Sequence, residues 1–148
     1  MSEDQTTLLV VDDDDVAMMA VRRAVKSLGL DVPTIRARDG REALDMLRDA
    51  HTRTVPYPFI VLLDINMPRM NGLEFLAELR ADPLLSGAVV FVMTTSDAPR
   101  DILAAYDHQV AGYIVKSSGQ ETLRKMFRML EEYNDIVTPF LDIRVGVA

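Results

Sequence analysis

Short apolar runs alternate with longer segments of helical period along this sequence, and the alternation repeats five times. The apolar runs are Leu8–Val11, Thr34–Ala37, Phe59–Leu63, Ala88–Met93 and Gly112–Val115. Short apolar runs separated by helical segments are typical of strand–helix–strand units and a parallel sheet. Because right-handed crossovers place helices on both faces of such a sheet, the pattern predicts an α/β three-layer sandwich.

The segments between these runs predict five helices and two longer loops. The first helix follows Asp12–Asp15 and ends near Gly29, and the second starts at the Asp39-Gly40 turn and ends near Ala50. The third helix carries Leu73, Leu76 and Leu79. The fourth spans Pro99–Asp107, and the fifth runs from about Gln120 to Asn134. Residues 51–58 and 67–72 are expected to be loops.

A chain of 148 residues fits one domain. We expect a single domain over residues 1–148, with a core at about 6–134 and a C-terminal extension at 135–148.

Charge and composition exclude several classes of protein. The formal net charge is -7 and no basic stripe is present, so we expect no contact with nucleic acid. The absence of cysteine removes disulfides and thiolate metal sites from consideration. The first seven residues lack a basic segment, and no apolar run approaches the roughly 18 residues of a membrane span. We therefore expect a cytoplasmic protein with no membrane contact.

Polar residues suited to chemistry follow the first, third, fourth and fifth predicted strands directly. They are Asp12 and Asp13 after the first strand, Asp64 and Asn66 after the third, Thr94, Thr95 and Ser96 after the fourth, and Lys116 after the fifth. In open α/β sheets the ligand site lies outside the carboxyl ends of the strands. We therefore expect these side chains to converge on one site.

Three carboxylates in one site require a compensating positive charge. At 4 Å and an effective dielectric constant near 20, each pair would repel by about 4 kcal/mol. Mg²⁺ binds carboxylates, water and phosphate oxygens, and Lys116 adds a point charge. A carboxylate in this setting can attack phosphorus and form an aspartyl phosphate. We assign this role to Asp64, with Asp12 and Asp13 as metal ligands and the Thr94 hydroxyl contacting a phosphoryl oxygen.

The motifs around these residues carry a family resemblance. They are Leu-Val-Val-Asp-Asp at 9–13, Leu-Leu-Asp-Ile-Asn-Met-Pro at 62–68 followed by Gly72, Met-Thr-Thr-Ser at 93–96, and Gly-Tyr-Ile-Val-Lys at 112–116. Over about residues 6–134 the chain resembles the receiver domain of two-component response regulators. The resemblance implies a flavodoxin-like (βα)5 fold with a five-stranded parallel sheet in the order 2-1-3-4-5.

The same resemblance implies a role for each residue that matches the family motifs. Asp64 would be the phosphoacceptor, Asp13 a direct Mg²⁺ ligand, Asp12 an acidic partner acting through water, Asn66 a metal ligand through its backbone carbonyl, Lys116 the phosphoryl-binding lysine, Thr94 the switch hydroxyl and Tyr113 the switch aromatic. Mn²⁺ or Ca²⁺ could replace Mg²⁺. One departure is Ser117, which stands where the family usually has a proline after the lysine. With serine at this position, we expect a differently shaped turn after the fifth strand and a less firmly positioned Lys116 side chain.

The implied function is that of a single-domain response regulator. A sensor histidine kinase would phosphorylate Asp64, and the protein would then dock to a target or pass the phosphoryl group to a histidine phosphotransfer protein. It would not be an enzyme beyond its own phosphorylation and dephosphorylation. The Thr-Thr-Ser run, the long loop at 51–58 and the tail resemble stand-alone receivers that serve phytochrome-type kinases.

Two other functions are compatible with parts of the sequence. One is a docking or dimerisation module of the same fold, with phosphotransfer weakened by Ser117. The other is a phosphohydrolase of the haloacid-dehalogenase type, although the nucleophile of that family follows the first strand. Individual residues also have simpler interpretations, because Asp12 and Asp13 could cap a helix and Tyr113 could serve packing alone.

The C-terminal part of the chain predicts a contact surface. The tail from Ile136 to Val147 is too apolar for a solvated end, so it either packs on a second subunit or folds back on its own domain. We expect a homodimer through the fourth helix, the fifth strand, the fifth helix and this tail.

Overall fold

The computed structural model describes residues 6–49, 54–116 and 121–136, without the side chains of 133–135. Within these residues, five strands alternate with five helices. They are β1 (Thr7–Val11), α1 (Asp15–Ser27), β2 (Thr34–Ala37), α2 (Gly40–Arg48), β3 (Phe59–Leu63), α3 (Gly72–Ala81), β4 (Val89–Thr94), α4 (Pro99–Asp107), β5 (Gly112–Val115) and α5 (Glu121–Ile136). Ser117 and most of the predicted tail lie outside the described residues.

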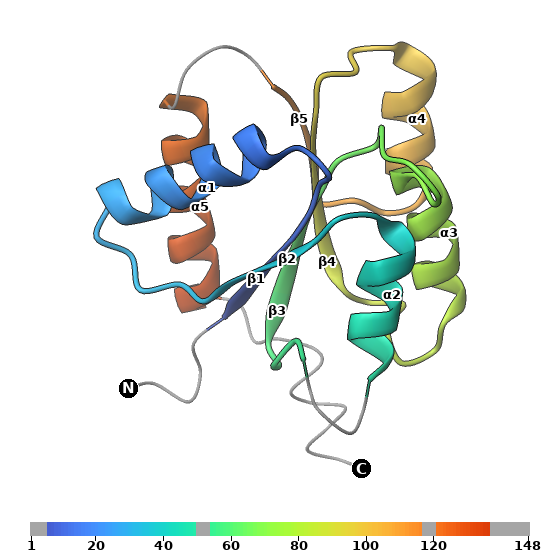
Figure 1. Cartoon of the computed structure of the whole chain (residues 1–148), viewed down its shortest axis with the longest axis horizontal. Coiled ribbons are helices and arrows are strands. Elements are labelled where there is room, and N and C mark those ends of the chain that lie inside the picture. The colour runs from blue at the N-terminus through green and yellow to red at the C-terminus, as the bar shows by residue number, and fades with distance from the viewer. Residues whose placement is uncertain (1–5, 50–53, 117–120, 137–148) are drawn as a thin grey trace.

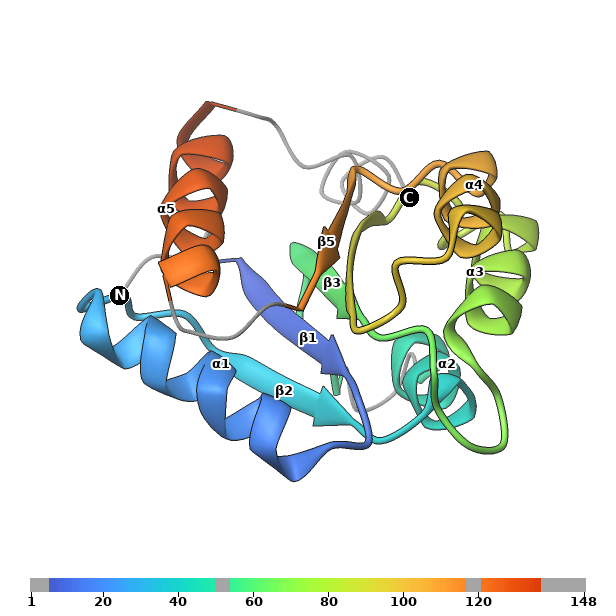
Figure 2. The ribbon, with the colours of Figure 1, turned by 90° about the horizontal axis from the view of Figure 1, so that it is seen from above.

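The strands form one parallel sheet in the order β2-β1-β3-β4-β5, which confirms the predicted flavodoxin-like topology. Helices α1 and α5 cover one face of the sheet, and α2, α3 and α4 cover the other (Figure 1). The view from above shows the same three layers, with the sheet between the two groups of helices (Figure 2). Within the described residues, no helix has the length and apolar character needed to cross a membrane.

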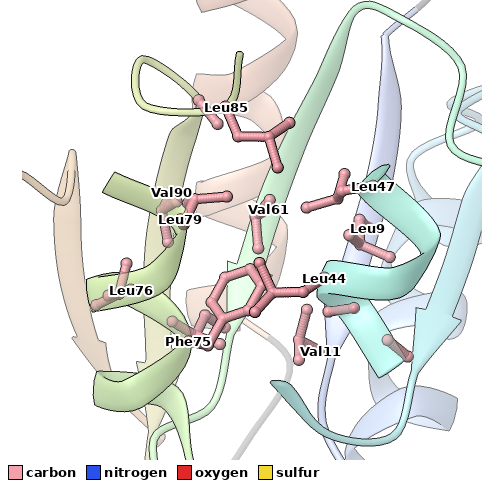
Figure 3. Close-up of a cluster of buried hydrophobic side chains, with 14 of the residues drawn as sticks. Leu9, Val11, Leu44, Leu47, Val61, Phe75, Leu76, Leu79, Leu85 and Val90 are labelled. Carbon is pink, nitrogen blue, oxygen red and sulfur yellow. The ribbon is translucent and has the colours of Figure 1, made fainter. Parts of the chain in front are cut away.

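Two apolar cores join the sheet to its helices. On the α2–α4 face, Leu9 of β1 and Val61 of β3 contact a cluster that includes Leu44 of α2 and Phe75 of α3 (Figure 3). On the other face, side chains of β1 and β3 pack against those of α1 and α5, and this cluster includes Leu8, Val10, Met18, Val21, Ile60, Leu62, Met126 and Phe127. Successive strand residues point to opposite faces, so the central strands are buried on both sides.

Caps on the helices fix the loops at the carboxyl ends of the strands. The Asp14 side chain accepts from the N–H of Val16 at the start of α1. Asn71 and Glu74 form a capping box at the start of α3. This cap makes Gly72 the first residue of α3, although the sequence predicted a loop there. The fourth strand also lies one residue later than predicted, at Val89–Thr94.

Candidate functional site

Three carboxylates meet at the carboxyl edge of the sheet. Asp12 and Asp13 follow β1 and Asp64 follows β3, and the carboxylate oxygens that they offer lie within 4.8 Å of one another. Asp12 and Asp64 are buried, with relative exposures of 2% and 7%, whereas Asp13 is exposed. The structure thus brings together the three acidic residues that the sequence singles out at the strand ends, as candidate metal ligands and phosphoacceptor.

Strand pairing and a glycine fix the backbone at Asp64. The N–H of Asp64 donates to the carbonyl oxygen of Val11 at 2.9 Å, which continues the pairing of β1 with β3 beyond the last strand residue. Gly72 lies close on the other side, where a Cβ atom would stand 2.4 Å from the carbonyl oxygen of Asp64. Only glycine allows α3 to begin this near to Asp64.

Lys116 supplies a positive charge inside the cluster. The backbone N–H of Lys116 donates to the carbonyl oxygen of Thr94 at 2.7 Å, so the pairing of β5 with β4 extends one residue beyond the end of β5. Its Nζ lies 2.8 Å from Asp12 Oδ2 and 3.9 Å from Asp64 Oδ2. The lysine therefore forms its close ion pair with Asp12 and keeps a longer electrostatic contact with Asp64.

The environment of Asp64 raises the pKa of its carboxyl group above the usual value. Burial is the main cause, and the negative charge of Asp12 acts in the same direction. The hydrogen bond from Thr94 and the charge of Lys116 oppose this change in pKa. Asp64 is thus a carboxylate with few water contacts beside two groups that stabilise its charged form.

Thr94 and Tyr113 lie on the neighbouring strands β4 and β5, where Thr94 pairs with Val115. Thr94 is fully buried at the end of β4 beside Asp64, and its hydroxyl oxygen accepts from the N–H of Ser96 at 3.4 Å. Tyr113 pairs with Val92 in the sheet, and its hydroxyl group donates to the carbonyl oxygen of Ser96 at 2.8 Å. Tyr113 therefore contacts the loop between β4 and α4, and its role as the switch aromatic stays a prediction.

Asn66 is exposed two residues beyond Asp64, and its N–H approaches Asp64 Oδ1 at 3.4 Å. The contact is local, with the carboxylate of Asp64 accepting from the backbone two residues later. The assignment of the Asn66 backbone carbonyl as a metal ligand stays a prediction.

The cluster has the donor chemistry of a magnesium site. Its candidate ligands are carboxylate oxygens, which are the donors that Mg²⁺ prefers. When ionised, the three carboxylates exceed the single charge of Lys116 by two negative charges. A divalent cation would balance this excess, so the residues present fit the predicted metal.

Sequence reasoning missed two contacts near the cluster. Arg36 of β2 donates from Nε to the carbonyl oxygen of Asp12 at 3.0 Å. The hydroxyl of Ser96 donates to Asp101 of α4 at 2.5 Å. Arg36 belongs to none of the quoted motifs, and the Met-Thr-Thr-Ser motif that contains Ser96 does not signal a contact with Asp101.

Comparison with protein families and known sequences identifies related proteins. The model of the response regulator receiver domain matches residues 8–128. Response regulator Rcp1 of Synechocystis sp. is 33% identical over 127 residues, which are 85% of this chain and 86% of Rcp1.

Solved structures are similar over most of their length. The phosphorylated cyanobacterial phytochrome response regulator RcpA superposes with a TM-score of 0.78 and 30% identity, over 90% of this chain and 96% of RcpA. The Mn²⁺-bound form of Rcp1 superposes with a TM-score of 0.76 and 32% identity, over 91% of this chain and 98% of Rcp1.

Proposed function

The chain belongs to the response regulator receiver domain family, and we propose that Asp64 is the residue through which it accepts a phosphoryl group. The family functions in two-component signalling, and its receivers take phosphoryl groups from histidine kinases. The single observation that carries the assignment of Asp64 is its burial beside Thr94 and Lys116, with Asp12 and Asp13 close by. The match over residues 8–128 supports a receiver core at about 6–134.

Phosphotransfer to Asp64 is a displacement at phosphorus. A carboxylate oxygen of Asp64 attacks the phosphorus atom of a phosphohistidine, the new O–P bond forms, and the P–N bond breaks. The electron pair of that bond returns to the imidazole, which takes up a proton and leaves as neutral histidine. Lys116 can shift from Asp12 towards the phosphoryl oxygens, since its Nζ already lies 3.9 Å from Asp64. The Thr94 hydroxyl can donate to another of these oxygens.

Mg²⁺ is the proposed cofactor, held by the carboxylates of Asp12, Asp13 and Asp64 and the backbone carbonyl of Asn66. When bound, it would supply positive charge to the phosphoryl oxygens in the transition state. Mn²⁺ or Ca²⁺ could take its place, and the Mn²⁺-bound structure of Rcp1 supports this choice of cation.

The proposed output is a change in protein contacts. Thr94 moves towards the phosphoryl group, Tyr113 follows, and the loop that carries Ser96 transmits the change to α4. Rcp1 and the phytochrome regulator RcpA are relatives, so a phytochrome-type histidine kinase is the proposed donor. A histidine phosphotransfer protein could receive the phosphoryl group afterwards. The exposed apolar side chains of α4, β5 and α5 support a homodimer through these elements.

The haloacid-dehalogenase alternative loses its support. The chain matches the receiver family, and Asp64 follows the third strand of the sheet. Signalling, with phosphorylation of the protein itself, is the function that these observations favour.

The test is phosphorylation of the purified protein by acetyl phosphate and Mg²⁺, followed by intact mass measurement. We expect one added phosphoryl group on the wild type and none on Asp64→Asn. Asp107→Asn, an exposed aspartate at the end of α4, is the matched control and should be phosphorylated normally. An adduct that persists in Asp64→Asn would show that another residue is the phosphoacceptor.

A further inference from the structure

Arg36 reaches from β2 to both ends of the acidic stretch that follows β1. Its Nε donates to the carbonyl oxygen of Asp12 at 3.0 Å, and its Nη1 lies 2.5 Å from Asp15 Oδ1. The Arg36 side chain is only 13% exposed, so it lies within the structure and not along its surface. Both contacts come from one guanidinium group whose nitrogen atoms are rigidly spaced.

The contact with Asp12 adds a side-chain hydrogen bond to the backbone hydrogen bond that β2 makes with this residue. The N–H of Asp12 donates to the carbonyl of Ala37, which is the last residue of β2. The carbonyl of Asp12 accepts from the Arg36 side chain, so both backbone groups of Asp12 are held by β2.

The stretch between these anchors contains Asp13. Asp12 is fixed by its bonds to β2, and Asp15, the first residue of α1, is fixed by its ion pair with Arg36. Asp13 lies between them and is exposed. An exposed carboxylate on a short, doubly anchored loop can point in few directions, which is the condition that a metal ligand needs.

We propose that Arg36 is a positioning residue for the cation site, because it braces the loop that presents Asp12 and Asp13. The inference rests on the magnesium site of the proposed function. Arg36 would not contact the cation itself. Residues that orient the ligands of a metal typically change its affinity about 10- to 100-fold when they are replaced.

The two possible effects of Arg36 on cation affinity have opposite signs. A guanidinium group near the site repels Mg²⁺, so loss of its charge alone would tighten Mg²⁺ binding. Loss of the brace would weaken binding, because the ligands would have to be ordered when the cation binds. Arg38 also contacts the Asp15 carboxylate and would keep it paired when Arg36 is replaced, so we expect the loss of the brace to prevail.

Arg38 provides a matched control for charge. Its Nη1 lies 3.5 Å from the same carboxylate oxygen of Asp15, but its side chain is 62% exposed. Its backbone N–H, which a substitution keeps, makes the bond to Glu42. Arg38→Gln therefore removes one positive charge near the acidic stretch and leaves the brace at Asp12 in place.

The experiment is a calorimetric titration with Mg²⁺ alone, without phosphodonor, on the wild type, Arg36→Gln, Arg36→Lys and Arg38→Gln. We expect the Kd for Mg²⁺ to rise about tenfold or more in Arg36→Gln. Arg36→Lys should show a smaller rise, since one ammonium group cannot span both acceptors as the guanidinium does. Arg38→Gln should keep the wild-type Kd or lower it.

Thermal unfolding with and without Mg²⁺ provides a second readout and shows whether each variant is folded. A cation that binds the folded state raises Tm, so a weakened site appears as a smaller rise. If Arg36→Gln does not fold, Arg36→Lys decides, and a wild-type Kd in that variant would overturn the inference. A wild-type or lower Kd in folded Arg36→Gln would overturn it as well. A wild type that binds no Mg²⁺ would overturn the proposed magnesium site and the inference with it.

Discussion

Two buried aspartates, Asp64 and Asp39, have pKa values displaced in opposite directions. Burial dominates at Asp64 and raises the pKa of its carboxyl group. At Asp39 the hydrogen bond from Arg69, at 2.7 Å, outweighs burial and lowers the pKa. The environment of Asp64 thus favours the protonated carboxyl group, whereas that of Asp39 stabilises a carboxylate paired with Arg69.

The lowered pKa of Asp39 predicts a stability that depends on pH. The unfolded chain binds more protons than the folded one between the two pKa values of this group. The stabilisation by the Asp39 carboxylate is therefore complete above the unfolded value, near 3.8, and is lost as the pH falls through the lower folded value. We expect Asp39→Asn to cost about 1 kcal/mol at pH 7, because asparagine keeps the cap on α2 but loses the charge that pairs with Arg69.

Urea unfolding of the wild type and Asp39→Asn without metal, at several pH values from 7 to 2.5, would measure this effect. The difference in free energy of unfolding between the two proteins should shrink towards zero at the acidic end. A difference that stays constant over this range would argue against the ion pair as its cause.

Residues that follow a strand directly could be placed from the sequence. The rule that parallel strands present their carboxyl ends at one edge brings Asp12, Asp64 and Lys116 together, as the structure does. Arg36 could not be placed in this way. Its contact with the backbone carbonyl of Asp12 depends on the course of a long side chain, which the residue pattern does not give even though it predicts the bounds of β2 correctly.

Among the elements, α4 is held differently at its two ends. At its C-terminal end, Arg80 donates to the carbonyl oxygens of His108 and Gln109, at 2.7 and 2.9 Å. At its N-terminal end, Ala98 provides no side-chain cap, and the hydroxyl of Ser96 reaches Asp101 instead. The end of α4 that lies nearer the site therefore depends on one hydroxyl group.

We expect Ser96→Ala to loosen the N-terminal end of α4 in the unphosphorylated protein. Loss of a hydrogen bond to a charged group should lower local stability by about 1 kcal/mol, which corresponds to roughly fivefold faster amide exchange. Hydrogen exchange measured by mass spectrometry should show the change at residues 99–103 and little change at 104–110, which Arg80 holds.

Ser86→Ala is the control for this experiment. Arg80 binds the backbone carbonyl of Ser86, which the substitution leaves in place. Exchange in α4 should therefore be unchanged in Ser86→Ala. Equal exchange of residues 99–103 in Ser96→Ala and the wild type would show that the Ser96 hydroxyl does not restrain the helix.

The bounds of elements were less predictable than their order. The third helix begins at Gly72 because the capping box of Asn71 and Glu74 fixes its first turn, whereas the sequence alone gives glycine the appearance of a loop residue. The order of the elements follows from the alternation of strand and helix periods, which does not depend on any single cap.

For the whole molecule, the edge of the sheet at β5 is the surface at which we expect a second protein chain to bind. β5 is the last strand of the sheet, and α4 and α5 flank it from opposite faces (Figure 2). Exposed apolar side chains lie on all three elements, namely Leu103 and Tyr106 on α4, Val115 on β5, and Met129 on α5. An edge strand with apolar neighbours is a template for association with a second chain.

The proposed homodimer predicts that a charge on this surface separates the subunits. Leu103 is 66% exposed on α4, and Leu103→Asp would place a carboxylate in the apolar contact, where burial of an unpaired charge is costly. Leu84, which is 72% exposed in the segment between α3 and β4, gives a matched control of the same chemistry outside this surface.

Light scattering coupled to size exclusion should be run with and without acetyl phosphate and Mg²⁺. We expect the wild type and Leu84→Asp to be dimers in at least one condition, and Leu103→Asp to be a monomer in both. The dimer Kd of Leu103→Asp should be raised tenfold or more, which corresponds to a loss of about 1.4 kcal/mol or more of binding free energy. A wild type that is monomeric in both conditions, or a Leu103→Asp variant that dimerises as the wild type does, would place the functional contact of this receiver elsewhere.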